Sequence, residues 1–449
     1  MKICVLNGSP RGQYSTTLQT GLYLQKRYPQ HEFAFVEVGS RISSLEKDIS
    51  PALTAMQSAD LIIFSYPVYT FLAPSQLHRF IAALKAGKAD LRGKWATQIT
   101  TSKHFYDVTA HRYIEDNCRD LGLRVIRGLS ADMEDLLTEK GRRDAEAFLE
   151  YAVWCVENGV CEPAPAPQSA APVPPAPTLA PVETTDGHDV AIVADLREGD
   201  ERLRAMIDSF IAACPAKTRL VNIADYPFKG GCLGCFHCAG DGKCVYPDGF
   251  DAFLREKIQK ADAIVYAFTV RDHSMGPTFK TYDDRQFCNG HRTVTEGSPV
   301  GYIVNGDLAA EENLRMVIEA RAQVGGNFLA GVATDEGDTA SELRGLAENL
   351  ALAMEKKLRR PANFYGVGGM KIFRDLIWLM RGLMKADHQF YKAHGVYDFP
   401  QKQRGKMLKM CFLGALVRNP KVKAKMGNKM NEGMVAPYRK VLAQARPKT

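Results

Sequence analysis

The sequence predicts two α/β domains in tandem, each built on a parallel, doubly wound sheet, followed by a basic helical segment. Three observations lead to this fold class. The chain has 449 residues, which is more than one ordinary hydrophobic core requires. Short apolar runs of strand length alternate with longer stretches of helical period, a pattern typical of parallel sheets. A stretch rich in proline and alanine separates two copies of this pattern.

Each copy contains five apolar runs of strand length, and we expect the strand order 2-1-3-4-5 in both. In the first copy the expected strands are Lys2–Leu6, Glu32–Val38, Leu61–Ser65, Trp95–Thr100 and Leu123–Ile126. In the second copy they are Asp189–Ala194, Arg219–Ile223, Ala263–Phe268, Val300–Val304 and Asn327–Val332. The offset grows from about 188 residues at the first strands to about 202 at the third, so the second copy has gained about fourteen residues after its second strand. Any ligand site is expected at the carboxyl ends of the strands.

These patterns divide the chain into four parts. We expect a first α/β domain at residues 1–160, a Pro/Ala-rich linker at 161–187, a second α/β domain at 188–358 and a basic helical extension at 359–449. Hydrophobic residues make up 45% of the chain and charged residues 24%, as in ordinary soluble proteins. No apolar run approaches the ~18 residues of a membrane span, and the first residues do not resemble a signal peptide, so we expect a cytoplasmic protein.

The net charge of +7 is concentrated towards the carboxyl end. Residues 361–449 hold about eighteen Lys and Arg against about four Asp and Glu. We expect a loop at Phe364–Gly369 and amphipathic helices at Lys371–Lys385 and Lys406–Val417. The favoured interpretation is a helical cap on a sheet domain or on a dimer partner. Contact with an anionic membrane surface is less favoured, and nucleic-acid binding is not expected because no binding motif accompanies the charge.

The segment that follows the first strand predicts a phosphate-binding loop. Residues 7–18 read NGSPRGQYSTTL and lead into a helix, whose N-terminus offers unpaired N–H groups and a partial positive charge. The hydroxyls of Ser9, Ser15 and Thr16 and the guanidinium of Arg11 add donors for an anion. The segment matches neither the triphosphate motif G-x-x-x-x-G-K-[ST] nor the dinucleotide motif G-x-G-x-x-G. The alternative is an ordinary capped helix after a turn.

Two further loops follow the third and fourth strands. Residues 66–77 read YPVYTFLAPSQL and residues 100–106 read TTSKHFY. Aromatic rings and a proline-fixed backbone offer a flat heterocycle surfaces and N–H groups, while small hydroxylated residues allow close approach to its edge. Because all three loops belong to the carboxyl-end rim of one sheet, they indicate one site at this rim.

With its three loops in this order, the stretch 1–158 resembles the flavodoxin-like NAD(P)H-dependent FMN reductase family, in which a G-S-P-R loop holds the FMN phosphate and a P-V-Y loop contacts the isoalloxazine ring. The resemblance implies a flavodoxin-like fold, bound FMN, hydride transfer from NADH or NADPH, and a homodimer. It implies no catalytic acid, because the family tunes the flavin mainly with backbone groups. Ser15 stands where many relatives carry Asn. The implied phosphate contacts are Ser9, Arg11, Ser15 and Thr16, and the implied ring contacts are Pro67, Val68, Tyr69, Thr70, Thr101 and Ser102.

Three side chains on or just past this rim are candidate contacts for a nicotinamide or a quinone. They are His104, Tyr106 and His111. A surface or packing role is the favoured interpretation for each of them.

Four of the eleven cysteines form a compact run in the second copy, Cys232, Cys235, Cys238 and Cys244, with the spacing C-x2-C-x2-C-x5-C. Interspersed glycines permit turns that let several thiolates converge on one centre. Three cysteines within seven residues is the spacing of iron–sulfur sites, whereas zinc sites usually pair two knuckles across a longer insert. The run resembles that of the iron–sulfur flavoproteins, which implies a [4Fe–4S] cluster. Thiols without metal and a zinc site are the alternatives, and Cys288 is expected to be a structural thiol.

The second copy differs from the first at both flavin loops. Its counterpart of the phosphate loop, Ala194–Arg202, carries four acids where the first copy has hydroxyls, and carboxylates repel a phosphate. Thr269–His273 does not reproduce the P-V-Y loop. We therefore expect one FMN per chain and an enzyme that passes electrons from NADH or NADPH through FMN, and through a cluster if one is bound, to a quinone, a flavin or a one-electron acceptor. The alternatives are a non-enzymatic electron carrier and a binding protein that senses redox state or metal.

Overall fold

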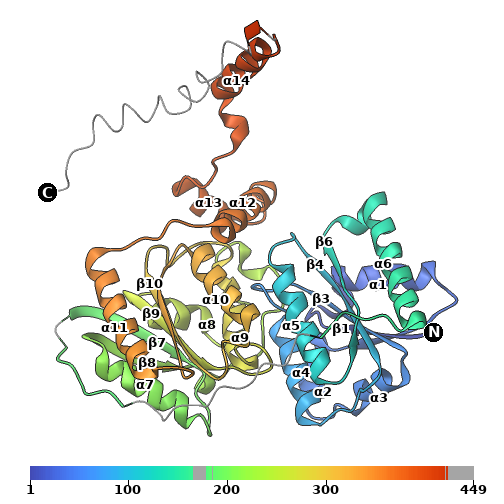
Figure 1. Cartoon of the computed structure of the whole chain (residues 1–449), viewed down its shortest axis with the longest axis horizontal. Helices are drawn as coiled ribbons and strands as arrows, with labels where there is room; N and C mark the ends of the chain where they lie inside the picture. Colours follow the sequence, from blue (N-terminus) through green and yellow to red (C-terminus); the bar gives the residue numbers. More distant parts are fainter. Residues whose placement is uncertain (165–177, 185, 420, 423–449) are drawn as a thin grey trace. The chain divides into compact units, whose positions relative to one another are not determined.

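The computed structural model describes most of the chain. The described residues are 1–164, 178–184, 186–419 and 421–422. Much of the expected Pro/Ala-rich linker, residues 165–177 and 185, lies outside them. The chain divides into two compact units, residues 1–390 and 391–449. The first unit holds both sheets and helices α1 to α12 (Figure 1). The four domain boundaries expected from sequence stay predictions.

All strands of the first sheet pair in parallel, in the order β2-β1-β3-β4-β5. Where the sequence predicts one fifth strand, the structure has two short pieces, and the second of them, β6, also pairs with β4. Gly128 lies between the pieces, where a Cβ atom would come within 2.7 Å of the carbonyl oxygen of Gln98. The strands are β1 (Lys2–Asn7), β2 (Glu32–Glu37), β3 (Leu61–Pro67), β4 (Trp95–Ser102), β5 (Arg124–Val125) and β6 (Leu129–Asp132).

Alternation of side chains along the strands divides the core of the first half into two layers. Ile3 and Val5 of β1 belong to the buried cluster under α1 and α6, whereas Cys4 and Leu6 belong to the cluster under α4 and α5. The helices are α1 (Thr16–Arg27), α2 (Ile42–Leu45), α3 (Ser50–Ser58), α4 (Ser75–Ala86), α5 (Asp107–Asp120) and α6 (Glu139–Asn158).

The second sheet repeats the topology of the first, with the order β8-β7-β9-β10-β11. The predicted order 2-1-3-4-5 is therefore confirmed in both halves. Its strands are β7 (Asp186–Ala194), β8 (Ala216–Asn222), β9 (Ala263–Thr269), β10 (Pro299–Asn305) and β11 (Phe328–Thr334). Its helices are α7 (Glu201–Ala213), α8 (Phe250–Phe253), α9 (Pro277–Arg285), α10 (Glu312–Gly325) and α11 (Thr339–Lys356).

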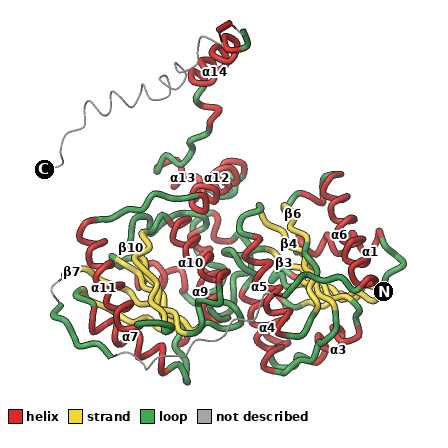
Figure 2. Tube along the Cα trace, viewed as in Figure 1, coloured by secondary structure: helices red, strands yellow, loops and turns green. Residues whose placement is uncertain are grey.

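The two halves pack through equivalent helices, as Figure 2 shows. Helix α4, which follows the third strand of the first half, packs on α9, which follows the third strand of the second. Helix α5 packs on α10 in the same way. One buried cluster runs through both halves, from Phe80 of α4 to Phe279 of α9. This is the isologous arrangement of a symmetric dimer, made within one chain.

Helix α12 (Phe364–Leu379) begins at Phe364, so the loop predicted at Phe364–Gly369 is wrong. Glycines disfavour an isolated helix, but tertiary packing requires them in this one. A Cβ atom on Gly366 would lie 2.9 Å from the carbonyl oxygen of Gln323, and one on Gly369 would lie 2.4 Å from the ring of Phe105. The glycines therefore let α12 lie close against α10 and the first half.

Two more described α-helices follow. Helix α13 (Lys385–Ala393) begins in the first unit and ends in the second, and helix α14 (Arg404–Val417) belongs to the second unit. Helix α14 exposes large apolar side chains, among them Leu408 and Phe412. Among the described helices, none combines the length and the apolar character that crossing a bilayer requires.

Candidate functional site

A cavity of about 500 Å³ lies between the two halves, at the carboxyl ends of β1, β3 and β4. This is the edge of the sheet where a doubly wound fold binds its ligands. The second half supplies the opposite wall from the cysteine run, the segment after α9, and helices α10 and α12. All the predicted cofactor contacts line it, namely Ser9, Arg11, Ser15, Thr16, Pro67, Val68, Tyr69, Thr70, Thr101 and Ser102.

Hydrogen bonds from neighbouring residues hold the conformation of the predicted phosphate loop. The side-chain amide of Asn7 donates to the carbonyl of Gly12 over 3.0 Å, and the Ser9 hydroxyl accepts from the Arg11 N–H over 3.3 Å. Ser15 caps α1 by accepting from the N–H of Leu18 over 3.3 Å. The first turn of α1 therefore meets the cavity with hydroxyls and N–H groups, which suits an anion.

The predicted ring-contact loop has a constrained backbone. Val68 donates its N–H to the carbonyl of Thr101 over 3.1 Å, which ties this loop to the third one. Thr70 and Phe71 have φ angles of 42° and 72°. Two consecutive non-glycine residues in the left-handed region are strained and need support from their surroundings.

The third loop meets the first through Thr101, whose hydroxyl lies 2.5 Å from that of Thr17. His104 and Tyr106, the candidate substrate contacts, are not among the residues that line the cavity. His104 is exposed and bonds to Asp107 and Ser130, and Tyr106 packs its ring against Phe71.

His111 also lies off the cavity, with its Nε2 atom 2.8 Å from the hydroxyl of Thr100. Burial lowers the pKa of His111 to about 4, which keeps the ring neutral at physiological pH.

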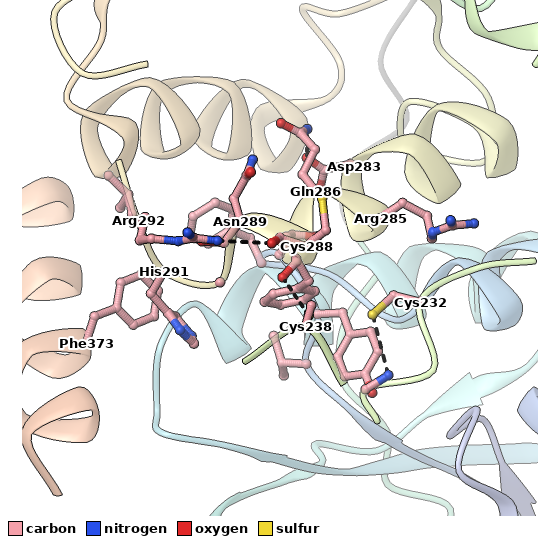
Figure 3. A pocket seen from close by; sticks show the side chains of 18 of the residues that line it. Cys232, Cys238, Asp283, Arg285, Gln286, Cys288, Asn289, His291, Arg292 and Phe373 are labelled. Atoms are coloured by element: carbon pink, nitrogen blue, oxygen red, sulfur yellow. Dashed lines mark hydrogen bonds between the residues drawn. The ribbon is translucent and has the colours of Figure 1, made fainter. Parts of the chain in front are cut away.

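The four cysteines of the run line the same cavity, as does Cys288. The Cys232 sulfur accepts from the N–H of Gly234 over 3.4 Å, and Cys238 donates to the carbonyl of Phe287 over 3.2 Å (Figure 3). Burial raises the pKa of the Cys238 thiol to about 11. Within the described residues, no three cysteine, histidine or carboxylate side chains are placed to hold a metal ion.

The cysteine run of the second half touches the phosphate loop of the first. Arg11 donates through Nε to the carbonyl of Gly234 over 2.9 Å, and its guanidinium lies 5.2 Å from the ring of Phe236. Gln76 of α4 donates to the carbonyl of Cys232 over 3.2 Å. The predicted phosphate-binding and metal-binding segments are therefore two walls of one cavity.

At the equivalent end of the second sheet, acids are paired with arginines of the same half. Arg197 makes two hydrogen bonds of 3.0 Å to Asp195, and Arg271 donates to Asp200 over 2.6 Å. Arg271 occupies the position that corresponds to Tyr69, 202 residues earlier. None of these four residues lines the cavity.

Sequence reasoning did not identify most of the second-half wall. A buried carboxylate, Asp283, pairs with Arg321 over 2.6 Å, and the Arg321 guanidinium lies 5.7 Å from the ring of Phe71. The internal duplication is the signal that could have found this wall, because it implies that equivalent helices can pair. Other unpredicted lining residues are Phe105, Phe236, Tyr266, Phe279, Phe287, His291, Arg292, Tyr302 and Phe373.

The sequence of this chain matches a family model and a curated protein. The model of the NADPH-dependent FMN reductase family matches residues 1–128 and 190–335, which together are more than half of the chain. A protein of Archaeoglobus fulgidus named iron-sulfur flavoprotein is 30% identical over 173 residues, which cover 36% of this chain and 78% of that protein.

Similar solved structures each cover about a third of the chain. An FMN-dependent NADH-azoreductase from Bacillus anthracis is 13% identical, with a TM-score of 0.28, and matches 35% of this chain and 100% of its own. A putative quinone reductase from Klebsiella pneumoniae is 15% identical, with a TM-score of 0.28, and matches 36% of this chain and 86% of its own.

Proposed function

The chain belongs to the NADPH-dependent FMN reductase family and is an FMN-dependent oxidoreductase, and from this premise we propose what it does. It takes hydride from NADH or NADPH and passes the electrons to a quinone, a flavin or a one-electron acceptor. It binds one FMN per chain, in the cavity between the halves, through the loops of the first half.

The observation that carries the proposal is the convergence of three loops on one cavity. The ten residues chosen from sequence come from three separate segments, and all of them line it. The chemistry of the cavity lining suits FMN, because hydroxyls and helix N–H groups lie at one part of the cavity and aromatic side chains at another. A volume of about 500 Å³ suits a cofactor of this size.

The chain's own part in the reaction is to bind and to orient. Ser9, Arg11, Ser15, Thr16 and the first N–H groups of α1 would hold the phosphate. Residues 67–70, with Thr101 and Ser102, would hold the ring. Aromatic side chains of both halves would exclude water from the reacting face. Bound FMN would supply the redox chemistry itself.

The test of the flavin site is Arg11→Ala, measured by titration of the purified protein with FMN. Loss of a charged hydrogen bond costs about 1.5–3 kcal/mol, which is about a 10- to 150-fold loss of affinity. Arg197→Ala, in the counterpart loop of the second half, is the control and leaves FMN binding unchanged. Unchanged affinity in Arg11→Ala contradicts this placement of the phosphate, and about two FMN per chain contradicts the single site.

We further propose that Cys232, Cys235, Cys238 and Cys244 are the ligands of a [4Fe–4S] cluster. The spacing of the run supports this. The thiols as placed in this structure do not fit a cluster, because no three of these described cysteines are placed to hold one metal ion. Iron and sulfide analysis of anaerobically purified protein decides: about four of each per chain support the cluster, and flavin without iron excludes it.

The homodimer and the cytoplasmic location expected from sequence also stay proposals. Gel filtration with light scattering tests the first of them, and localisation of the tagged protein in cells tests the second.

A further inference from the structure

One lysine of the second half is buried against the ring-contact loop of the first. Lys280 of α9 has no exposed surface. A buried ammonium group is tolerated only when its N–H donors have hydrogen-bond partners. Its Nζ atom donates to the carbonyl of Tyr69 over 2.9 Å and to the hydroxyl of Thr70 over 2.7 Å. It also pairs with the carboxylate of Asp284, one turn further along α9.

Asp284 completes the connection to the first half and is equally buried. One carboxylate oxygen accepts from the hydroxyl of Thr70 over 2.8 Å, and the other accepts from the N–H of Ser75 over 2.7 Å. Ser75 is the first residue of α4. The pair therefore holds both ends of the segment between β3 and α4.

This segment is the one whose backbone needs support. Thr70 and Phe71 have positive φ angles, and the corresponding residues of the second half, Asp272 and His273, have similar ones of 52° and 58°. The support differs between the halves, however. The residue that corresponds to Lys280 in the first half is His78, which stacks on Tyr113 at 4.0 Å between ring centroids.

We propose that Lys280 and Asp284 are positioning residues for the flavin, through which the second half holds the ring-contact loop of the first half in its binding conformation. The inference rests on the proposed flavin site. It gives the second half a role in flavin binding that does not depend on metal at the cysteine run. The pair acts on the loop through the carbonyl of Tyr69, the hydroxyl of Thr70 and the N–H of Ser75.

The test compares full-length variants by FMN titration and by visible circular dichroism of the bound flavin. Lys280→Met combined with Asp284→Asn removes both charges and leaves neither unpaired. We expect this double variant to bind FMN about 10-fold more weakly, since each lost hydrogen bond costs about 2- to 10-fold, and to change the flavin's dichroism bands.

The control removes a partly buried ion pair that lies within the second half. Arg202 and Asp335 pair over 2.8 Å, so Arg202→Met with Asp335→Asn should lower stability and leave flavin affinity and dichroism unchanged. If the Lys280 double variant behaves like this control, the positioning role is wrong. If the double variant does not fold, Asp284→Asn alone is compared with Asp335→Asn in the same two assays, and equal behaviour of these two variants also contradicts the positioning role. A wild-type protein that binds no FMN overturns the proposed function itself, and the positioning role with it.

Discussion

His273 joins the two halves through charges, and its removal should make the stability of the protein less dependent on pH. Its Nδ1 atom lies 2.8 Å from a carboxylate oxygen of Glu311 in its own half, and its Nε2 atom lies 3.0 Å from Asp120 of α5 in the first half. Lys85 also pairs with Asp120, over 2.6 Å, and with Asp272 over 3.2 Å. The perturbation is His273→Gln, which keeps a hydrogen-bonding side chain but cannot carry charge.

The size of the effect follows from the pKa of His273. Burial opposes the charged imidazole, but hydrogen bonds to Asp120 and Glu311 and their negative charges outweigh it and raise the pKa to about 10 from 6.5. A raised pKa means that the added stability is complete below pH 6.5 and is lost between pH 6.5 and 10. At 1.36 kcal/mol per pH unit the ceiling is about 5 kcal/mol. The side chains of His273 and Asp120 are 27% and 46% exposed, so solvent screens their interaction. We therefore expect a contribution to stability of roughly 1–2 kcal/mol.

The assay is urea unfolding of wild type and His273→Gln at several pH values between 6.5 and 10. Wild type should be the more stable near pH 7, and its advantage should shrink by about 1–2 kcal/mol as the pH approaches 10. His104→Gln, whose hydrogen bonds lie within the first half, should show no comparable trend. An advantage that stays constant across this range refutes the assignment of a charged, bridging His273.

Two further changes test the packing beneath the site. Gly39→Ala puts a Cβ atom 2.4 Å from the backbone of the phosphate loop, so flavin affinity should fall at least about 10-fold; Gly345→Ala, where the space is open, should keep wild-type affinity, and equal behaviour of the two would contradict the close approach. Tyr66→Phe removes a buried hydroxyl that donates to Gln98 over 2.6 Å, so the free energy of unfolding should drop by about 1–3 kcal/mol in urea titrations; an unchanged midpoint would show that this bond adds nothing.

Much of the fold could be predicted because its signals are local. Runs such as Leu61–Ser65 and Ala263–Phe268 are almost entirely apolar, as expected of a strand covered by helices on both faces. Both appear as strands: β3 is two residues longer than predicted, and β9 is one residue longer. The three loops of the first half were also predictable, because a parallel sheet brings the carboxyl ends of its strands to one edge.

The opposite wall of the cavity could not be predicted in this way. Its position depends on how α9 and α10 pack on α4 and α5, and hydrophobic periodicity shows only that each helix has a buried face. Lys280 and Asp284 illustrate the difficulty, since charged residues in a helix usually indicate a solvent-exposed face. Their burial makes sense only beside Thr70 and Ser75, more than 200 residues earlier in the chain. The glycines of α12 present the same problem, because local preference predicts a loop there and a tertiary contact requires a helix.

The packing of α4 on α9 and of α5 on α10 has a consequence for how this architecture can change. In a symmetric homodimer both subunits have the same sequence, so every substitution changes both of them. A residue that supports the partner's site must therefore also be compatible with the same site in its own subunit. Covalent linkage removes this restriction, because a substitution enters one half only. It also fixes the partner at a high effective concentration, so the assembly of the cavity walls does not depend on dilution. One half was thus free to keep its hydroxyl-lined loop, while the other filled the same position with Asp195 and Arg197.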